Sequence, residues 1–207
     1  MNDFYKNIKL IENPDDLLVL VNKNNMLYQK FIPNNLEKIN ELYSVNTKYL
    51  RNDAKECFEK LCKDAKKLNL SIKAESTYRS FEYQKKLYDN YVLKYGSEYA
   101  NACSAKPGHS EHQTGLSVDV RGSEGDYNNF SNTKEFSWMI KNAPNYGFIL
   151  RYPYDKQNIT GFKYEPWHYR YVGKIALEIT KNNLTLEEYL ENNIKNFEII
   201  VYYYFGC

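Results

Sequence analysis

The chain has only three histidines among its 207 residues, and its cysteines and charges are typical of neither a zinc ribbon nor a nucleic-acid binder. Cys57, Cys62, Cys103 and Cys207 form no C-x-x-C pair, which argues against a zinc ribbon and against a dense disulfide framework. Cys57 and Cys62 fall in a helical pattern and are expected in or near the core. Because 28 Lys and Arg face 26 Asp and Glu, the net charge of +2 does not favour nucleic acid or a membrane surface as a partner.

Signals for export are also missing from this chain. No basic stretch followed by an apolar one opens it, and no run of about 18 apolar residues occurs. As it stands, the chain is therefore expected to be cytoplasmic and not to insert into a membrane. An upstream anchor missing from this sequence would place the same domain outside the cytoplasm. The sequence does not indicate an oligomeric state.

Hydrophobic periodicity predicts helices and strands that alternate after a poorly patterned first quarter. Helices are expected over 53–69, from 81 to about 95, over 133–142, and in two short segments before 190. Strands are expected over 70–77, 116–120, 147–152 and 163–172, a further extended segment begins at Asp15, and 26–50 is expected to be irregular. Asp53 and Ser80 are candidate N-caps, Asn69 a helix end, and Thr185 with Glu188 a capping box. The second helix is expected to bury Phe81, Leu87, Tyr88, Tyr91, Val92 and Tyr95.

All three histidines lie in or beside two short segments, SEHQTGLSVD (Ser110–Asp119) and EPWHYRYVG. His112, Asp119 and His168 are residue types that zinc prefers, and a catalytic zinc site has three protein ligands and one open position. Gly115 permits a tight turn that returns the chain as the strand bearing Asp119, on the face opposite the apolar residues.

Glu165 lies three residues before His168, and in an ideal strand the two side chains would point to opposite faces. Pro166 is expected to mark a bend that turns both inward. Glu165 would then be placed to accept a proton from zinc-activated water, whose pKa falls to about 7. Either segment alone is a weak signal, but together the two segments favour a metal site.

These segments resemble the signatures of the VanY-type D-alanyl-D-alanine carboxypeptidases, within the lysostaphin, D-Ala-D-Ala peptidase and Sonic hedgehog fold group. SEHQTGLSVD is similar to the S-x-H-x-x-G-x-x-x-D motif, and EPWHYRYVG to the E-x-W-H segment. Further similar segments, in chain order, are LVNKNN, TYRSFEYQ (77–84), GFILRYP (147–153) and LTLEEYL (184–190). The resemblance covers nearly all of residues 17–190. It implies one peptidase domain, with residues 1–50 as a lead-in, 51–190 as the catalytic core and 191–207 as a tail of unknown role.

The resemblance implies a role for each matching residue. His112, Asp119 and His168 would bind Zn²⁺, and Glu165 would be the general base. Arg79 would be a catalytic and substrate-binding residue, because its fixed charge and donor fork suit a carbonyl oxygen that becomes an oxyanion. Gln84 and Ser110 would bind the substrate's terminal carboxylate. His109 is expected to line the pocket without binding the metal.

The implied fold is α+β, a small antiparallel sheet flanked by helices with zinc in a cleft on the sheet. The implied activity is removal of the C-terminal D-Ala from peptidoglycan stem peptides or their precursors. Alternatives are a D-Ala-D-Ala dipeptidase, an L,D-carboxypeptidase, an endolysin-type peptidase, or a zinc-containing module that binds cell-wall peptides without cleaving them. Two positions depart from the family pattern: Ser117 stands where a small apolar residue is usual, and Thr77 where Gly is common. Neither is expected to touch a metal ligand.

Overall fold

The computed structural model describes residues 4–125 and 129–194. The strands are β1 (Lys9–Leu10), β2 (Asn25–Met26), β3 (Leu36–Lys38), β4 (Tyr49–Arg51), β5 (Lys73–Ser76), β6 (Ser117–Arg121), β7 (Phe148–Leu150) and β8 (His168–Tyr171). The α-helices are α1 (Asn52–Lys67), α2 (Phe81–Tyr95), α3 (Ser97–Cys103), α4 (Lys134–Asn142), α5 (Gln157–Thr160) and α6 (Ala176–Lys181). A last helix is described over 186–194. Residues 195–207, most of the expected tail, lie outside the described part of the chain.

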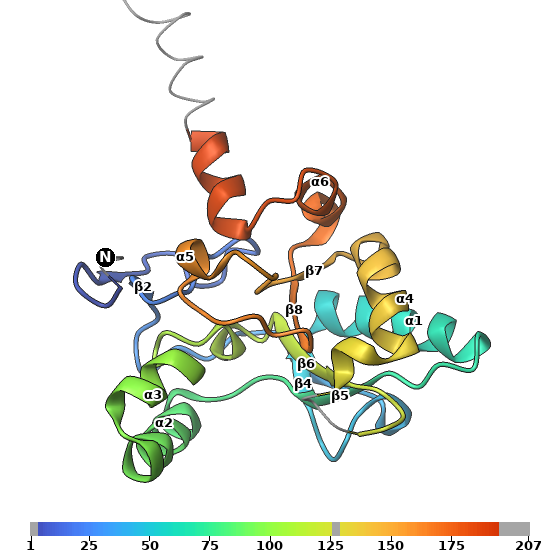
Figure 1. Cartoon of the computed structure of the whole chain (residues 1–207), viewed down its shortest axis with the longest axis horizontal. Helices are drawn as coiled ribbons and strands as arrows, with labels where there is room; N and C mark the ends of the chain where they lie inside the picture. Colours follow the sequence, from blue (N-terminus) through green and yellow to red (C-terminus); the bar gives the residue numbers. More distant parts are fainter. Residues whose placement is uncertain (1–3, 126–128, 195–207) are drawn as a thin grey trace, which may run out of the picture.

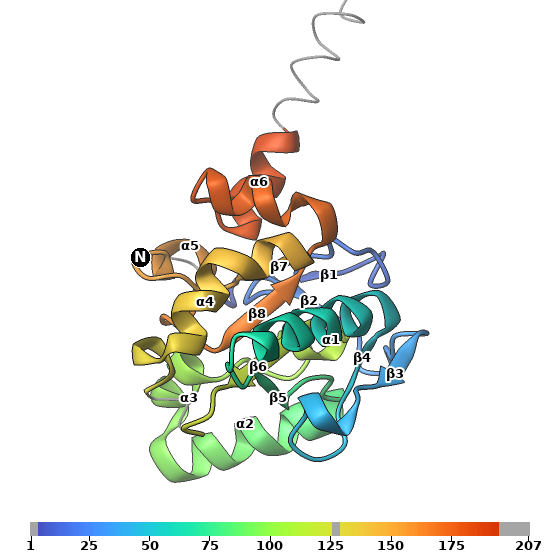
Figure 2. The ribbon, with the colours of Figure 1, turned by 90° about the vertical axis from the view of Figure 1, so that its right-hand side faces the viewer.

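The central sheet has four antiparallel strands in the order β5-β6-β8-β7. Figures 1 and 2 show α1 and α4 on one side of these strands and α2 and α3 on the other. This arrangement confirms the predicted α+β fold. In the β6–β8 register, Asp119 lies directly opposite His168, so the sheet itself brings two of the predicted ligands together.

Alternation along β6 divides its side chains between two environments. Val118 and Val120 are fully buried and belong to the main core, which also contains Phe58 and Leu61 of α1. The side chain of Asp119 points the other way and lines a cleft. The predicted separation of apolar residues from Asp119 is therefore confirmed.

The helices match the predicted spans closely, but two details were wrong. Arg51, not Asp53, occupies the N-cap position of α1, and its side chain makes no capping hydrogen bond. In α2 the predicted buried stripe is only half-buried, Tyr95 is half exposed, and Gln84 is the one buried residue. The reason is that α2 flanks the cleft, so its apolar residues form a wall and not a core. Ser80, whose Oγ accepts from the Tyr83 N–H at 3.1 Å, is the predicted N-cap.

Two N-terminal predictions were also wrong. The segment that begins at Asp15 forms turns, because Asp16 Oδ1 accepts the Leu18 N–H at 2.7 Å and so offers the backbone an alternative to a strand. The segment 26–50, expected to be irregular, contains β3 and β4, which pair antiparallel. Toward the other end, the Thr185–Glu188 capping box is confirmed, with reciprocal bonds of 2.7 and 3.2 Å. Among the described residues, no helix has both the length and the apolar character needed to cross a membrane.

Candidate metal and catalytic site

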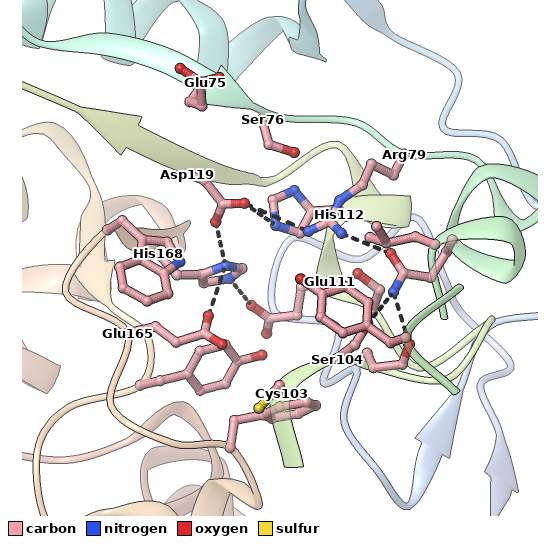
Figure 3. Close-up of a pocket in the computed structure, with 18 of the residues that line it drawn as sticks. Glu75, Ser76, Arg79, Cys103, Ser104, Glu111, His112, Asp119, Glu165 and His168 are labelled. Atoms are coloured by element: carbon pink, nitrogen blue, oxygen red, sulfur yellow. Dashed lines mark hydrogen bonds and ion pairs between the residues drawn. The ribbon is translucent and has the colours of Figure 1, made fainter. Parts of the chain in front are cut away.

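A cleft of about 770 Å³ lies between the sheet and the α2–α3 side of the molecule (Figure 3). Seven of its lining residues are those predicted to form the site: Arg79, Gln84, Ser110, His112, Asp119, Glu165 and His168. They come from three separate segments of the chain, 79–84, 110–119 and 165–168. The structure therefore gathers every predicted site residue around one cavity.

His112 presents an unprotonated nitrogen to the cleft. It lies in the short 3₁₀ helix η2 (Glu111–Thr114) and is 1% exposed. Its Nδ1 donates to the Thr77 carbonyl at 2.6 Å. A neutral imidazole carries one hydrogen, so Nε2 keeps its lone pair. Burial, together with the charge of Arg79, lowers the pKa of His112 to about 4, so the ring is neutral at neutral pH. Nε2 is buried with no hydrogen-bond partner.

Asp119 connects the two histidines. Its Oδ2 lies 3.2 Å from His112 Nε2, and its Oδ1 lies 2.9 Å from His168 Nδ1. One potential ligand atom from each of the three residues lies within 4.8 Å of the others. Zinc–ligand bonds of about 2.0–2.2 Å place tetrahedral ligand atoms about 3.3 Å apart, so these residues fit zinc. The buried lone pair of His112, which no protein group satisfies, indicates the same.

Protonation of this cluster depends on its partners. Burial raises the pKa of Asp119, but its contacts with His112 and His168 outweigh burial and hold that pKa well below the usual range. Burial alone would lower the pKa of His168, yet hydrogen bonds to Asp119 and Glu111 raise it to about 9. Without a metal, His168 therefore carries the proton that a bound cation would displace.

The Glu165 side chain reaches the cluster of predicted ligands from a turn of the backbone. A His168 N–H to Glu165 C=O bond of 3.1 Å closes a turn through Pro166, which confirms the predicted bend. Glu165 Oε2 then lies 3.8 Å from His168 Nδ1. Burial raises the pKa of Glu165 to about 7, partly offset by the nearby His168. A carboxylate with this pKa is suited to accepting a proton near neutrality.

Arg79 lies on the α2 side of the cluster. Its Nη2 lies 3.6 Å from Asp119 Oδ2, and its Nη1 donates to Gln84 Oε1 at 2.9 Å. Its Nε is buried without a partner. The Gln84 amide nitrogen donates to Ser104 Oγ and to the Ala105 carbonyl. The guanidinium is thus held at the cleft with donor capacity to spare.

Comparison with known proteins identifies the family. The profile described as VanY, D-alanyl-D-alanine carboxypeptidase, matches residues 47–174, a span that contains all seven cleft residues above. The chain belongs to the VanY family. As a VanY carboxypeptidase it is a metallopeptidase.

Relatives agree with this assignment. The bifunctional D-Ala-D-Ala dipeptidase and carboxypeptidase VanXYC of Enterococcus gallinarum is 38% identical over 178 residues, which cover 83% of this chain and 92% of that protein. The solved LdcB LD-carboxypeptidase is 40% identical, with a TM-score of 0.84, and the match covers 92% of this chain and 94% of that one. A Zn(II) complex of a mutant vancomycin resistance D,D-pentapeptidase VanY is 34% identical, with a TM-score of 0.71 over 84% of this chain and 98% of that one.

Two expectations about neighbouring residues were wrong, those for Thr77 and His109. Thr77 touches a predicted ligand through its carbonyl, which accepts from His112. Ser117 contacts Glu111, which is not one of the predicted ligands: its Oγ donates to Glu111 Oε2 at 3.2 Å. His109 is not among the residues that line the cleft. Its Nδ1 contacts the Asn22 carbonyl at 2.8 Å and its ring packs edge-on against Tyr5.

Sequence reasoning missed one group at this VanY site, the buried cluster of Glu111, Arg151 and Arg170. Glu111 Oε1 accepts from Arg151 Nε at 2.7 Å and from Arg170 Nη1 at 2.9 Å. Burial raises the pKa of Glu111, but the two guanidinium charges outweigh it and hold that pKa well below its usual range. The one available signal was the position of Glu111 inside the SEHQTGLSVD segment, next to a predicted ligand.

Proposed function

We propose that this protein is a zinc-dependent D,D-carboxypeptidase that removes the C-terminal D-Ala from peptidoglycan stem peptides or their precursors. The observation that carries the proposal is the buried, partnerless Nε2 of His112, which faces Asp119 and His168 beside a glutamate with a raised pKa. Family membership supports the substrate class.

Distances within the cluster support the proposed set of ligands. His112 Nε2, an Asp119 carboxylate oxygen and His168 Nδ1 would hold the ion. When bound, zinc polarises a carbonyl as a Lewis acid and lowers the pKa of water to about 7. Three protein ligands would leave one position for water or substrate, as catalytic zinc sites do.

Glu165 would move the proton. Its carboxylate lies beside the ligand cluster and has a pKa near neutrality, so it can take a proton from water and deliver it to the amine that leaves. Arg79 would stabilise negative charge on the oxygen of the scissile carbonyl, since Nε and part of the guanidinium fork remain available. Ser110 lines the same cleft and would bind the terminal carboxylate of the peptide. Gln84, predicted to share that contact, donates both amide hydrogens within the protein, so it would act on the substrate by holding Arg79.

A second candidate is an L,D-carboxypeptidase. It is favoured by the similarity to LdcB, which is higher in identity and TM-score than the similarity to the zinc-bound D,D-pentapeptidase. Both activities release D-Ala, but the residue before it is D-Ala in one case and an L-centre in the other.

The test is incubation of the zinc-loaded protein with three peptides, followed by mass analysis of the products. The peptides are a stem pentapeptide, in which a tripeptide is followed by D-Ala-D-Ala, a stem tetrapeptide ending in an L-centre and D-Ala, and free D-Ala-D-Ala. Release of one alanine from the first supports the proposal, and release from the second supports the L,D alternative. Cleavage of the third indicates a dipeptidase, and larger fragments indicate an endolysin-type peptidase. If the zinc-loaded protein bound the first or the second peptide and cleaved none of the three, the result would favour the non-catalytic binding module.

A further inference from the structure

We propose that Glu111 is a positioning residue of the metal site, which orients His168 so that Nδ1, and not Nε2, faces the metal. The inference rests on the proposed zinc site and adds a role for a residue outside the predicted ligand set. Figure 3 shows His168 between Asp119 on one side and Glu111 on the other.

The two nitrogens of His168 have different neighbours. Nδ1 lies 2.9 Å from Asp119 Oδ1 and 3.8 Å from Glu165 Oε2, at the centre of the cleft cluster. Nε2 lies 3.5 Å from Glu111 Oε2, at the outer limit of a hydrogen bond. Nδ1 is therefore the nitrogen available to a metal, and Nε2 is the one whose hydrogen needs an acceptor.

Glu111 suits this role because its position is fixed from the other side. The residue is 1% exposed, and its Oε1 accepts from two guanidinium groups, those of Arg151 and Arg170. Its second oxygen, Oε2, faces His168 and also accepts from Ser117 Oγ. A carboxylate held by three donors cannot follow the imidazole, so the imidazole must adapt to the carboxylate.

The two histidines then have equivalent support. A metal-bound histidine almost always donates its other N–H to a carbonyl or carboxylate, which fixes both the tautomer and the orientation of the ring. For His112 the acceptor is the Thr77 carbonyl. For His168 it is Glu111, because Asp119 is itself predicted to bind the metal. The ring of Tyr152, packed 4.8 Å from His168 between centroids, limits tilting of the imidazole but does not choose between its nitrogens.

Ser117 gives this chain an additional contact. The resemblance to the family led us to expect a small apolar residue at this position. The Ser117 hydroxyl donates to the same Glu111 oxygen that faces His168. The hydroxyl helps to aim Oε2. Replacement by alanine removes one donor and leaves both arginine contacts in place, so Ser117→Ala is a mild change at the same point.

The test compares zinc affinity in Glu111→Gln with that in Glu135→Gln. Glu135 is also buried, but it accepts from the Ser71 and Ser123 backbone N–H groups, at the other end of β6. Kd for zinc is measured by competition with a chelator, and melting of the metal-free proteins reports folding separately. Loss of such a support typically weakens metal binding 10- to 100-fold. We expect this loss in Glu111→Gln, a smaller one in Ser117→Ala, and a Kd within three-fold of wild type in Glu135→Gln.

Imidazole ¹⁵N chemical shifts of the zinc-loaded wild-type protein show which nitrogen of His168 binds the metal. This measurement needs no variant, so it tests the inference even if Glu111→Gln does not fold. We expect His168 Nε2 to carry a hydrogen and Nδ1 to carry none. An Nε2-bound metal would overturn the inference, as would a folded Glu111→Gln protein with wild-type zinc affinity. A wild-type protein that binds no zinc would instead overturn the proposed function, so the two failures are distinguishable.

Discussion

The guanidinium of Arg79 is held by the side chain of Gln84, five residues later, through a 2.9 Å bond from Nη1 to Oε1. The first residue precedes α2 and the second lies in its first turn, so the start of one helix fixes both. Because the Gln84 amide nitrogen donates within the protein, its structural effect is to aim Arg79 at the cleft.

Arg79→Ala should leave fold and metal content unchanged but reduce turnover. Removal of one donor to an oxyanion typically costs about 10²–10³-fold in rate. The measurement is kcat/KM for the peptide that the wild-type protein cleaves best. Arg121→Ala is the control, because Arg121 pairs with Glu75 at 3.1 Å and does not line the cleft. Equal activity of the two variants would make Arg79 an ordinary structural residue.

Glu165→Gln should bind zinc and peptide but cleave slowly. The amide keeps the shape of the side chain and cannot accept a proton, and loss of a general base costs about 10²–10⁴-fold. Zinc content, peptide binding and turnover are measured on the same preparation. Loss of zinc would instead make Glu165 a ligand, and unchanged turnover would mean that another group takes the proton.

His168→Ala should lose most of its zinc, because one of three ligands is removed from the cluster. Elemental analysis after gel filtration should give about one zinc per chain for the wild-type protein and much less for the variant. His109→Ala is the matched control, since this histidine is also buried but contacts Asn22 and Tyr5, away from the cluster. Full zinc retention in His168→Ala would contradict the ligand set.

The metal-free protein should become less stable as the pH rises from about 6.5 to about 9. Burial disfavours the His168 imidazolium, but hydrogen bonds to Asp119 and Glu111 outweigh it and raise the pKa from 6.5 to about 9. The folded state thus holds this proton more tightly than the unfolded state, and its contribution is complete below pH 6.5 and lost as the pH rises through 9. At 1.36 kcal/mol per unit, the loss is on the order of 3 kcal/mol. The free energy of unfolding is measured by urea titration at several pH values with a chelator present. If His168→Gln showed the same dependence on pH, the loss of stability would belong to another group.

Gly115→Ala should destabilise the protein by more than the about 1–2 kcal/mol that a left-handed backbone costs an alanine. Gly115 has φ +67° and ψ 14°, in the left-handed region, and a Cβ there would also lie 2.7 Å from Leu36 Cδ2. The free energy of unfolding is measured for Gly115→Ala in the wild-type protein and in a Leu36→Ala background. We expect a smaller loss in the second background, because the contact with Leu36 is removed there. Equal losses in the two backgrounds would show that Leu36 moves aside at no cost.

Much of the site could be predicted because its parts follow local rules. The alternation around Asp119 indicated the face of β6 that carries this predicted ligand. Pro166 indicated the bend that brings Glu165 and His168 together, and the Ser80 cap placed the start of α2 beside Arg79. Each of these depends on a few neighbouring residues and on backbone geometry. The resemblance to a known family supplied the roles.

What could not be predicted depends on partners that are distant in sequence. Charged residues are normally assigned to the surface, so Arg151 and Arg170 gave no sign of being fully buried until Glu111 was placed between them. The half-buried stripe of α2 could not be predicted for a similar reason. Hydrophobic periodicity identifies the apolar face of a helix, but not whether that face packs against the core or lines a cleft. The turn at Asp16 arises from a side-chain bond that hydrophobic patterns do not detect.

Arg170 also donates from Nη2 to the carbonyl oxygens of Leu17 and Val19, both at 3.0 Å, some 150 positions earlier in the chain. Every residue type supplies a carbonyl, so substitutions at positions 17 and 19 leave these acceptors in place. A deletion or insertion nearby would shift the acceptors away from the arginine. The lead-in can therefore vary in sequence but not in length, and a shortened protein that starts where the VanY profile begins, at residue 47, would lack the acceptors altogether.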